Sequence, residues 1–162
     1  MRIVTAAVLV SSLAMASAQG RSAESVVHDT TYGFSIAAPS FPKEEGSGIS
    51  VTPIIFAGPV RDGKAPSCNV QIQNMGATLS SFRTQSLGQL KALGLTLESE
   101  ANRKVSGKDA LYFVSSGHDV KMLSLAAQVG QSIYVVTCMT AANQFAKYEK
   151  ALKGAIDSFS LD

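Results

Sequence analysis

Hydrophobic and polar residues alternate along much of the chain, and this pattern predicts a succession of strands. From Cys68 to Asn74, Cys68, Val70 and Ile72 face one way while the polar residues between them face the other, as side chains do on opposite faces of a sheet. A proline at position 53 interrupts one run, which is typical of an edge strand or a bulged strand. The full pattern predicts strands at 26–28, 34–37, 49–56, 68–74, 95–105, 110–116, 120–129 and 132–140.

The connections between these strands indicate how they pair. Turns at 106–108, 117–119 and 130–131 are too short for a crossover, so residues 95–140 predict an antiparallel meander of four consecutive strands. The segments 39–48 and 58–66 are rich in proline and glycine, and we expect both to be surface loops.

Two segments change to the helical period. Residues 78–93 predict an amphipathic helix with Thr78 or Asn74 as its cap and Gly94 as its stop; its apolar stripe comprises Leu79, Phe82, Leu87, Leu90 and Leu93. Residues 141–159 predict a second helix that docks one apolar stripe on the sheet and turns Lys147, Lys150 and Lys153 to solvent.

These elements predict an α+β fold. The strands at 110–114 and 133–136 are apolar at both parities, so we expect both faces of the sheet to be covered. Two main helices packed on a mostly antiparallel sheet of about six to eight strands make a three-layer sandwich. We find no internal repeat, and one domain accounts for residues 19–162.

The first 18 residues have the pattern of a cleaved signal peptide. Arg2 precedes an apolar run up to Met15, and Ala16-Ser17-Ala18 places cleavage before Gln19. The apolar run is too short to span a bilayer, so we favour a leader over a membrane anchor. The sequence therefore predicts a periplasmic or secreted protein.

Export changes the interpretation of the two cysteines. In an oxidising compartment Cys68 and Cys138 can form a disulfide. Both lie at inward-facing positions of predicted strands, which equally allows two buried thiols that pack as small hydrophobic side chains. The sequence leaves both possibilities open.

Composition and charge exclude several functions. Hydrophobic residues make up 46% of the chain and charged residues 16%, which favours a folded domain over disorder. The formal charge of +2 is too small to drive binding to nucleic acid. We find no phosphate loop and no cofactor fingerprint, so we expect no cofactor.

The chemistry-bearing residues gather in turns. If every predicted strand crosses the sheet, the turn after the first strand, the 58–66 loop, the 117–119 turn and the start of the last helix share one end. We expect a partner protein to dock there, because a rigid sheet presents these turns. The expected docking residues are Arg61, Asp62, Lys64, His118 and Asp119.

Two alternative functions use the same end of the sheet. His28, Asp29, His118 and Asp119 could together bind zinc, copper or nickel, although aspartates are also ordinary turn residues. A secreted hydrolase would need a serine beside one of the histidines, but the chain contains no Gly-x-Ser-x-Gly elbow. We therefore expect a non-enzymatic protein.

A resemblance to a known family adds to this interpretation. The segment Tyr32-Gly33-Phe34-Ser35-Ile36 followed by Pro39 and Phe41, then Asn69-Val70-Gln71-Ile72, a helix, a meander and a last helix resemble the PsbP-like and Ran-binding Mog-type sandwich. Its exported bacterial relatives are the DcrB-like envelope proteins. Such relatives often have a tryptophan where this chain has Phe41. The resemblance implies an accessory protein that docks on an envelope or extracellular partner, with no shared active site to transfer.

Overall fold

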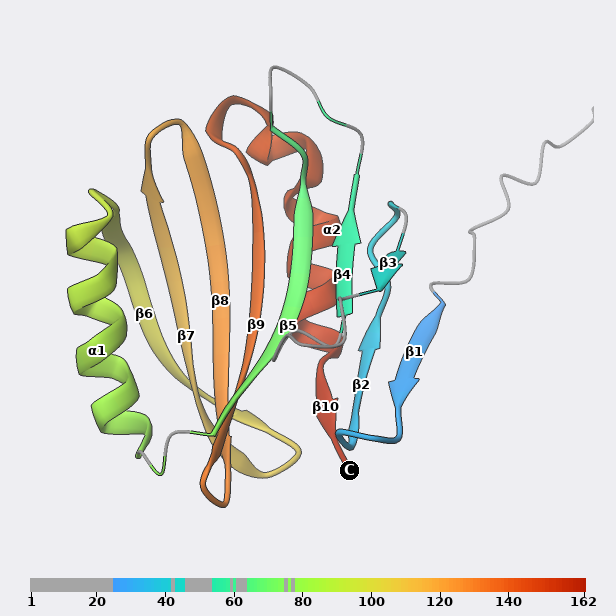
Figure 1. Cartoon of the computed structure of the whole chain (residues 1–162). Helices are drawn as coiled ribbons and strands as arrows, with labels where there is room; N and C mark the ends of the chain where they lie inside the picture. The colour runs from blue at the N-terminus through green and yellow to red at the C-terminus, as the bar shows by residue number, and fades with distance from the viewer. Residues whose placement is uncertain are drawn as a thin grey trace, which may run out of the picture.

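A computed structural model describes residues 25–41, 43–45, 54–58, 60, 64–74, 76 and 78–162. Figure 1 shows the course of the chain. The elements are β1 (Val26–Asp29), β2 (Phe34–Ala37), β3 (Lys43–Glu45), β4 (Ile54–Ala57), β5 (Ser67–Asn74), α1 (Leu79–Ala92), β6 (Thr96–Val105), β7 (Lys108–Gly117), β8 (Val120–Val129), β9 (Ser132–Ala141), a 3-10 helix (Ala142–Gln144), α2 (Phe145–Ser158) and β10 (Ser160–Leu161).

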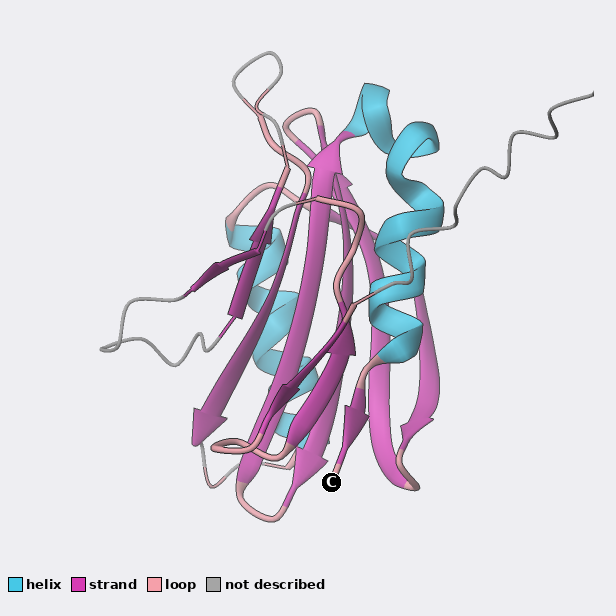
Figure 2. Cartoon of the chain, turned by 90° about the vertical axis from the view of Figure 1, so that its right-hand side faces the viewer, coloured by secondary structure: helices cyan, strands magenta, loops and turns pink. Residues whose placement is uncertain are grey.

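The main sheet has seven antiparallel strands in the order β3-β4-β5-β9-β8-β7-β6. Helices α1 and α2 lie on opposite faces of it, as the side view in Figure 2 shows. The predicted α+β sandwich and its four-stranded meander are therefore confirmed. Neither described helix is long and apolar enough to cross a membrane.

The two faces of the main sheet are covered very unequally. On the α2 side, a core of 21 buried residues joins the sheet to α2 and to a second, three-stranded sheet of order β1-β2-β10. On the α1 side, the core has only six buried residues, and Phe82 is the single contribution of the helix. Most of the hydrophobic stabilisation therefore comes from the α2 side, because it scales with buried apolar area.

The helix boundaries follow the sequence closely. Thr78 is the N-cap of α1, and its hydroxyl accepts a hydrogen bond from the N–H of Ser81 at 3.2 Å. Gly94 follows the helix with a φ of 68°, in the left-handed region that ends a helix at low cost when the residue is glycine. The sheet does not bury the whole apolar stripe predicted for this helix, because Leu93, the last residue of the stripe, is 64% exposed.

Two predictions about the N-terminal half were wrong. The strands near 26 and 34 do not join the main sheet; they pair with each other, and β2 also pairs with β10. The expected loop at 39–48 contains the short strand β3, which pairs with β4. Its sequence Lys-Glu-Glu has no hydrophobic pattern that would predict a strand. An edge strand can form without such a pattern, because its backbone hydrogen bonds to the neighbouring strand are sufficient.

The two cysteines are neighbours across the pair β5–β9. Cys68 lies directly opposite Cys138, both side chains are fully buried in the larger core, and the structure joins them in a disulfide. Their sequence separation is 70 residues, so the bond closes a long loop of the unfolded chain. The disulfide stabilises the folded state because it lowers the conformational entropy of the unfolded chain.

Replacing both cysteines should therefore lower stability markedly. We expect Cys68→Ala/Cys138→Ala to reduce the free energy of unfolding by about 4 kcal/mol, as measured by urea denaturation. A reducing agent should destabilise the wild type by a similar amount and leave the double variant unchanged. A wild type that does not respond to reduction in denaturant would contradict this account.

Candidate functional site

Three of the predicted docking residues lie together at one end of the main sheet. The ammonium group of Lys64 donates to the backbone carbonyl of His118 at 3.0 Å and contacts that of Asp119 at 3.4 Å. The loop that follows β4 therefore touches the turn between β7 and β8. The sequence predicts this contact if every strand crosses the sheet. Arg61 and Asp62 lie outside the described residues.

The β7–β8 turn has an unusual backbone. His118 and Asp119 have φ values of 48° and 58°, in the left-handed region that two-residue hairpin turns require and that asparagine and glycine fill more easily. Histidine and aspartate adopt this conformation more readily than most side chains, but still at a cost relative to glycine. Hydrogen bonds offset this cost: the ring Nε2 of His118 bonds the carbonyl of Leu93 at 3.0 Å, and the carbonyl of Asp119 accepts from the N–H of Ala142 at 2.8 Å. The turn thus joins the end of α1 to the segment that precedes α2.

His28 and Asp29 lie at the opposite end. Figure 1 places the β1–β2 turn at the lower end of the molecule and the β7–β8 turn at the upper end. A hydrogen bond holds the β1–β2 turn there: the hydroxyl of Tyr134, near the β8–β9 turn, donates to the backbone carbonyl of Tyr32 at 2.8 Å. Burial and the charge of Asp29 raise the pKa of Tyr134, so the hydroxyl stays protonated as a donor.

His28 and Asp29 each have a hydrogen-bond partner in their own hairpin. The Nδ1 of His28 is 2.8 Å from the hydroxyl of Ser35, its neighbour across β1–β2. The carboxylate of Asp29 accepts from the N–H groups of Thr31 and Tyr32, both at 3.0 Å, which closes the turn. Both residues therefore stabilise their own hairpin.

The expectation that His28, Asp29, His118 and Asp119 share one end was wrong. Each strand that crosses the sheet reverses the direction of the chain. The prediction from the sequence did not include β3, so it assigned the wrong direction to the two strands before it, β1 and β2. Within the described ranges, no group of three or more His, Cys, Asp or Glu side chains comes together in a way that could hold a metal ion. The placement of these four residues therefore gives the metal-binding alternative no support.

A recess of about 180 Å³ lies between α1 and the face of the main sheet that α1 covers only in part. Its apolar lining comprises Phe82, Leu90, Leu93, Phe113, Met122, Ala126 and Val135. Its polar lining comprises Gln71, Gln73, Ser86, Gln89, Ser115, Ser124 and Thr137. None of these fourteen side chains is ionisable, so the recess can donate and accept hydrogen bonds but offers no general acid or base.

The recess is not predicted from the sequence, although part of its signal is visible there. Gln71 and Gln73 were placed on the outward face of their strand, and an outward face rich in amides is a surface that no core fills. The apolar stripe of α1 gives no such signal, because it predicts only which side of the helix faces the sheet. Only the structure shows that Leu90 and Leu93 line an open recess instead.

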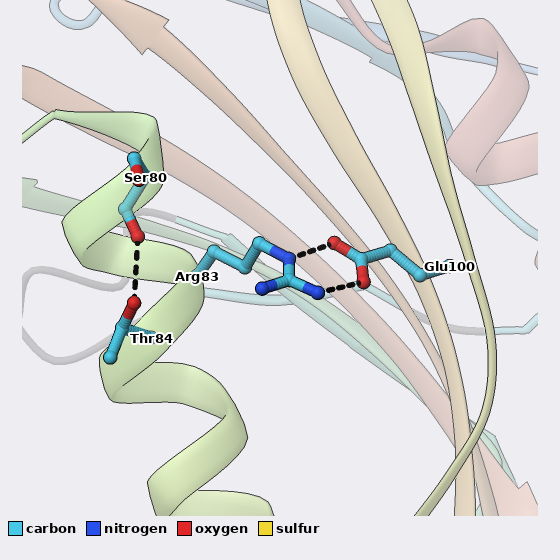
Figure 3. A network of polar contacts seen from close by, with 4 residues as sticks. All are labelled: Ser80, Arg83, Thr84 and Glu100. Carbon is cyan, nitrogen blue, oxygen red and sulfur yellow. Dashed lines mark hydrogen bonds and ion pairs between the residues drawn. The ribbon is translucent and has the colours of Figure 1, made fainter.

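Helix α1 forms one wall of the recess and has few anchors. Besides Phe82, it is held at its start by the N–H of Leu79, which donates to the side-chain oxygen of Gln128 on β8 at 3.0 Å. It is also held by Arg83, whose guanidinium binds both carboxylate oxygens of Glu100 on β6 at 2.5 and 2.7 Å (Figure 3). The helix itself continues normally past this residue, with the hydroxyl of Thr84 bonded to the carbonyl of Ser80. The hydrogen bond and the positive charge of Arg83 lower the pKa of Glu100.

Comparison with known proteins identifies the fold. No family model and no curated protein matches the sequence. The cyanobacterial PsbP protein CyanoP from Synechocystis sp. PCC 6803 superimposes with a TM-score of 0.63 at 15% identity, over 91% of this chain and 99% of that chain.

Two further solved structures are similar. PA94, a protein of unknown function from Pseudomonas aeruginosa, has a TM-score of 0.58 at 13% identity and covers 83% of this chain and 94% of its own. LpqN, involved in cell envelope biogenesis of Mycobacterium tuberculosis, has a TM-score of 0.56 at 12% identity, with coverage of 85% and 89%. The predicted PsbP-like fold is therefore confirmed, and at these identities the likeness concerns the fold alone.

Removing the buried anchor of α1 should loosen the wall of the recess. We expect Phe82→Ala to cost about 3 kcal/mol of stability and to speed amide hydrogen exchange in residues 79–92 more than in β8 and β9. Leu93→Ala is the matched control, and because Leu93 is mostly exposed we expect less than about 0.5 kcal/mol. Unchanged exchange in the helix of Phe82→Ala would contradict the assignment of Phe82 as its anchor.

The ion pair between Arg83 and Glu100 should make stability depend on pH. Because the pKa of Glu100 in the folded state lies below its ordinary value of 4.5, the pair stabilises fully above that pH. The contribution is lost as the pH falls through the lowered pKa. Glu100→Gln should therefore lose less stability than the wild type on acidification in urea denaturation, and Arg83→Gln should show the same reduced slope. Identical pH profiles for all three proteins would contradict the pairing.

Proposed function

We propose that this chain is an exported accessory protein that binds an envelope or extracellular protein and catalyses no reaction. The observation that carries the proposal is a group of exposed apolar side chains at the end of the main sheet where Lys64 contacts the β7–β8 turn. The recess beside α1 supports it: hydroxyls and amides lie there among apolar side chains without an ionisable group, a lining that suits binding better than proton transfer. The proposal includes no cofactor.

The leader-like residues 1–18 support a location in the periplasm or outside the cell. The fold supports the same proposal indirectly, because LpqN is described as involved in cell envelope biogenesis. No described feature favours the metal-binding or the hydrolase alternative over binding of a protein partner.

The proposed docking surface is the end of the main sheet that carries the β7–β8 turn. We call it the turn-end surface and define it by Val60, Lys64, Leu93, His118, Asp119 and Met139. Its apolar members are unusually accessible, with exposed fractions of 71% for Val60, 64% for Leu93 and 36% for Met139. Exposed apolar side chains beside a few charged groups resemble the composition of protein interfaces. Arg61 and Asp62 belong to the same loop in sequence and complete the proposed docking residues.

The contacts of the turn-end surface also favour binding. Lys64, His118 and Asp119 connect three segments through the hydrogen bonds described above. A surface held in this way loses little conformational entropy when a partner binds, so more of its contact energy remains as affinity. One member of the surface, Leu93, also lines the recess beside α1.

Site-specific photocrosslinking in living cells tests the proposal. A photoreactive residue placed at Val60 or Leu93 should yield one discrete crosslinked partner. Tyr32 is the matched control position, because it is also an exposed hydrophobic residue but belongs to the β1–β2 turn, which lies at the opposite end of the molecule. We expect Lys64→Ala/Leu93→Asp to weaken binding of the purified partner by about tenfold or more, the loss typical of central interface residues.

Two outcomes would contradict the docking surface. One is crosslinking from Tyr32 that equals crosslinking from Val60 and Leu93. The other is unchanged affinity of Lys64→Ala/Leu93→Asp for the partner, measured on variants whose thermal unfolding matches that of the wild type.

A further inference from the structure

Strand β6 is a long open edge of the main sheet. It has ten residues and pairs on one side only, with β7. Seven of its ten residues are exposed, and within the described part of the chain no backbone group pairs with its outer side. The other edge strand, β3, has only three residues. An unpaired edge of this length is a template for another strand.

The usual protections cover only part of this edge. A bulge lies between Leu97 and Ser99, so the register with β7 is regular from Ser99 to Val105. The ion pairs of β6 lie on the faces of the sheet: Arg83 of α1 binds Glu100 on one face, and Asp157 of α2 binds Arg103 on the other at 2.7 Å. These contacts hold the side chains above and below the sheet and leave the backbone edge uncovered.

The order of charges along β6 is self-complementary. Glu98 and Glu100 lie in the first half of the strand, and Arg103 and Lys104 lie in the second half. Two copies that run in opposite directions therefore bring acidic residues opposite basic ones. Two copies that run in the same direction would bring like charges together, which is unfavourable.

We propose that this chain forms a symmetric dimer in which β6 of one copy pairs antiparallel with β6 of a second copy. The charge order favours the register that places Asn102 opposite Asn102 of the second copy. Glu100 then lies opposite Lys104 of the other copy, twice per dimer. Opposed residues of an antiparallel pair project to the same face, and Glu100 and Lys104 are an even number of residues apart within the regular stretch.

Lys104 is available for this contact. It is 65% exposed, and its intramolecular partner Asp109 is 82% exposed, so their mutual attraction is weak and easily exchanged. Glu100 keeps its bond to Arg83 and presents a carboxylate that is already fixed in position. The new pairs therefore require little rearrangement.

The dimer is compatible with the proposed docking function and does not depend on it. The two sheets would join into one continuous sheet, and the twofold axis would reverse the strand direction between the copies. The turn-end surfaces would then point in opposite directions, and both would remain free, because β6 contributes none of their residues. If the dimer does not form, the docking proposal is unaffected and is decided by the crosslinking experiment.

Sedimentation velocity over a series of concentrations tests the dimer in the full mature chain. The wild type should show a reversible monomer–dimer equilibrium. Glu100→Lys and Lys104→Glu should each weaken dimerisation by about tenfold or more, because each replaces two attractive contacts with two repulsive ones. An equimolar mixture of the two variants should restore dimerisation as a heterodimer, and Glu100→Lys/Lys104→Glu in one chain should restore the homodimer.

Lys147→Glu on α2 is the matched control, since it reverses an exposed charge away from β6; it should dimerise as the wild type does. Circular dichroism should report the same fold for every variant. A wild type that stays monomeric at all concentrations would overturn the proposal. A dimer that ignores both charge reversals, or a mixture of the two variants that stays monomeric, would overturn it equally.

Discussion

The structure depends on one constraint: both faces of the seven-stranded sheet are apolar and need cover, but α1 covers its face far less than α2 and the small sheet cover theirs. The side of α2 carries the large core, the disulfide and the small sheet. On the other side a single helix contributes one buried side chain. The recess and the exposed Leu93 both result from this incomplete cover.

The β7–β8 turn shows how a local cost is offset by tertiary contacts. A His-Asp pair fills the two left-handed positions of this turn less easily than Asn-Gly, although both residue types tolerate positive φ better than most side chains. Its hydrogen bonds to the end of α1 and to the segment before α2, together with the contact from Lys64, hold it in that conformation. The same contacts fix the relative positions of the segments around the turn, so structural strain and a preorganised surface have a common origin.

Much of the fold could be predicted from the sequence, because period and punctuation were strong where the elements were long. The meander, the cap at Thr78 and the stop at Gly94 follow from local rules. Strand β3 could not be predicted, because Lys43-Glu44-Glu45 has neither alternation nor β-forming residues. That one omission was enough to place His28 and Asp29 at the wrong end, since inferred direction depends on the number of strands. The recess was missed because a stripe of apolar residues on a helix does not reveal how much of it the sheet covers.

Strand β6 shows how the same charges can serve two purposes. Every charged residue of β6 has an intramolecular partner: Lys121, Arg83, Asp157 and Asp109 pair with Glu98, Glu100, Arg103 and Lys104. Charges of either sign discourage indiscriminate pairing of an edge, because desolvating them costs more than a backbone ladder gains. Their order along the strand adds direction and register to this protection. The charges are compensated by a strand that presents the opposite charge order in space, and a second copy of β6 that runs antiparallel does so. An edge that rejects most strands is thereby selective for one.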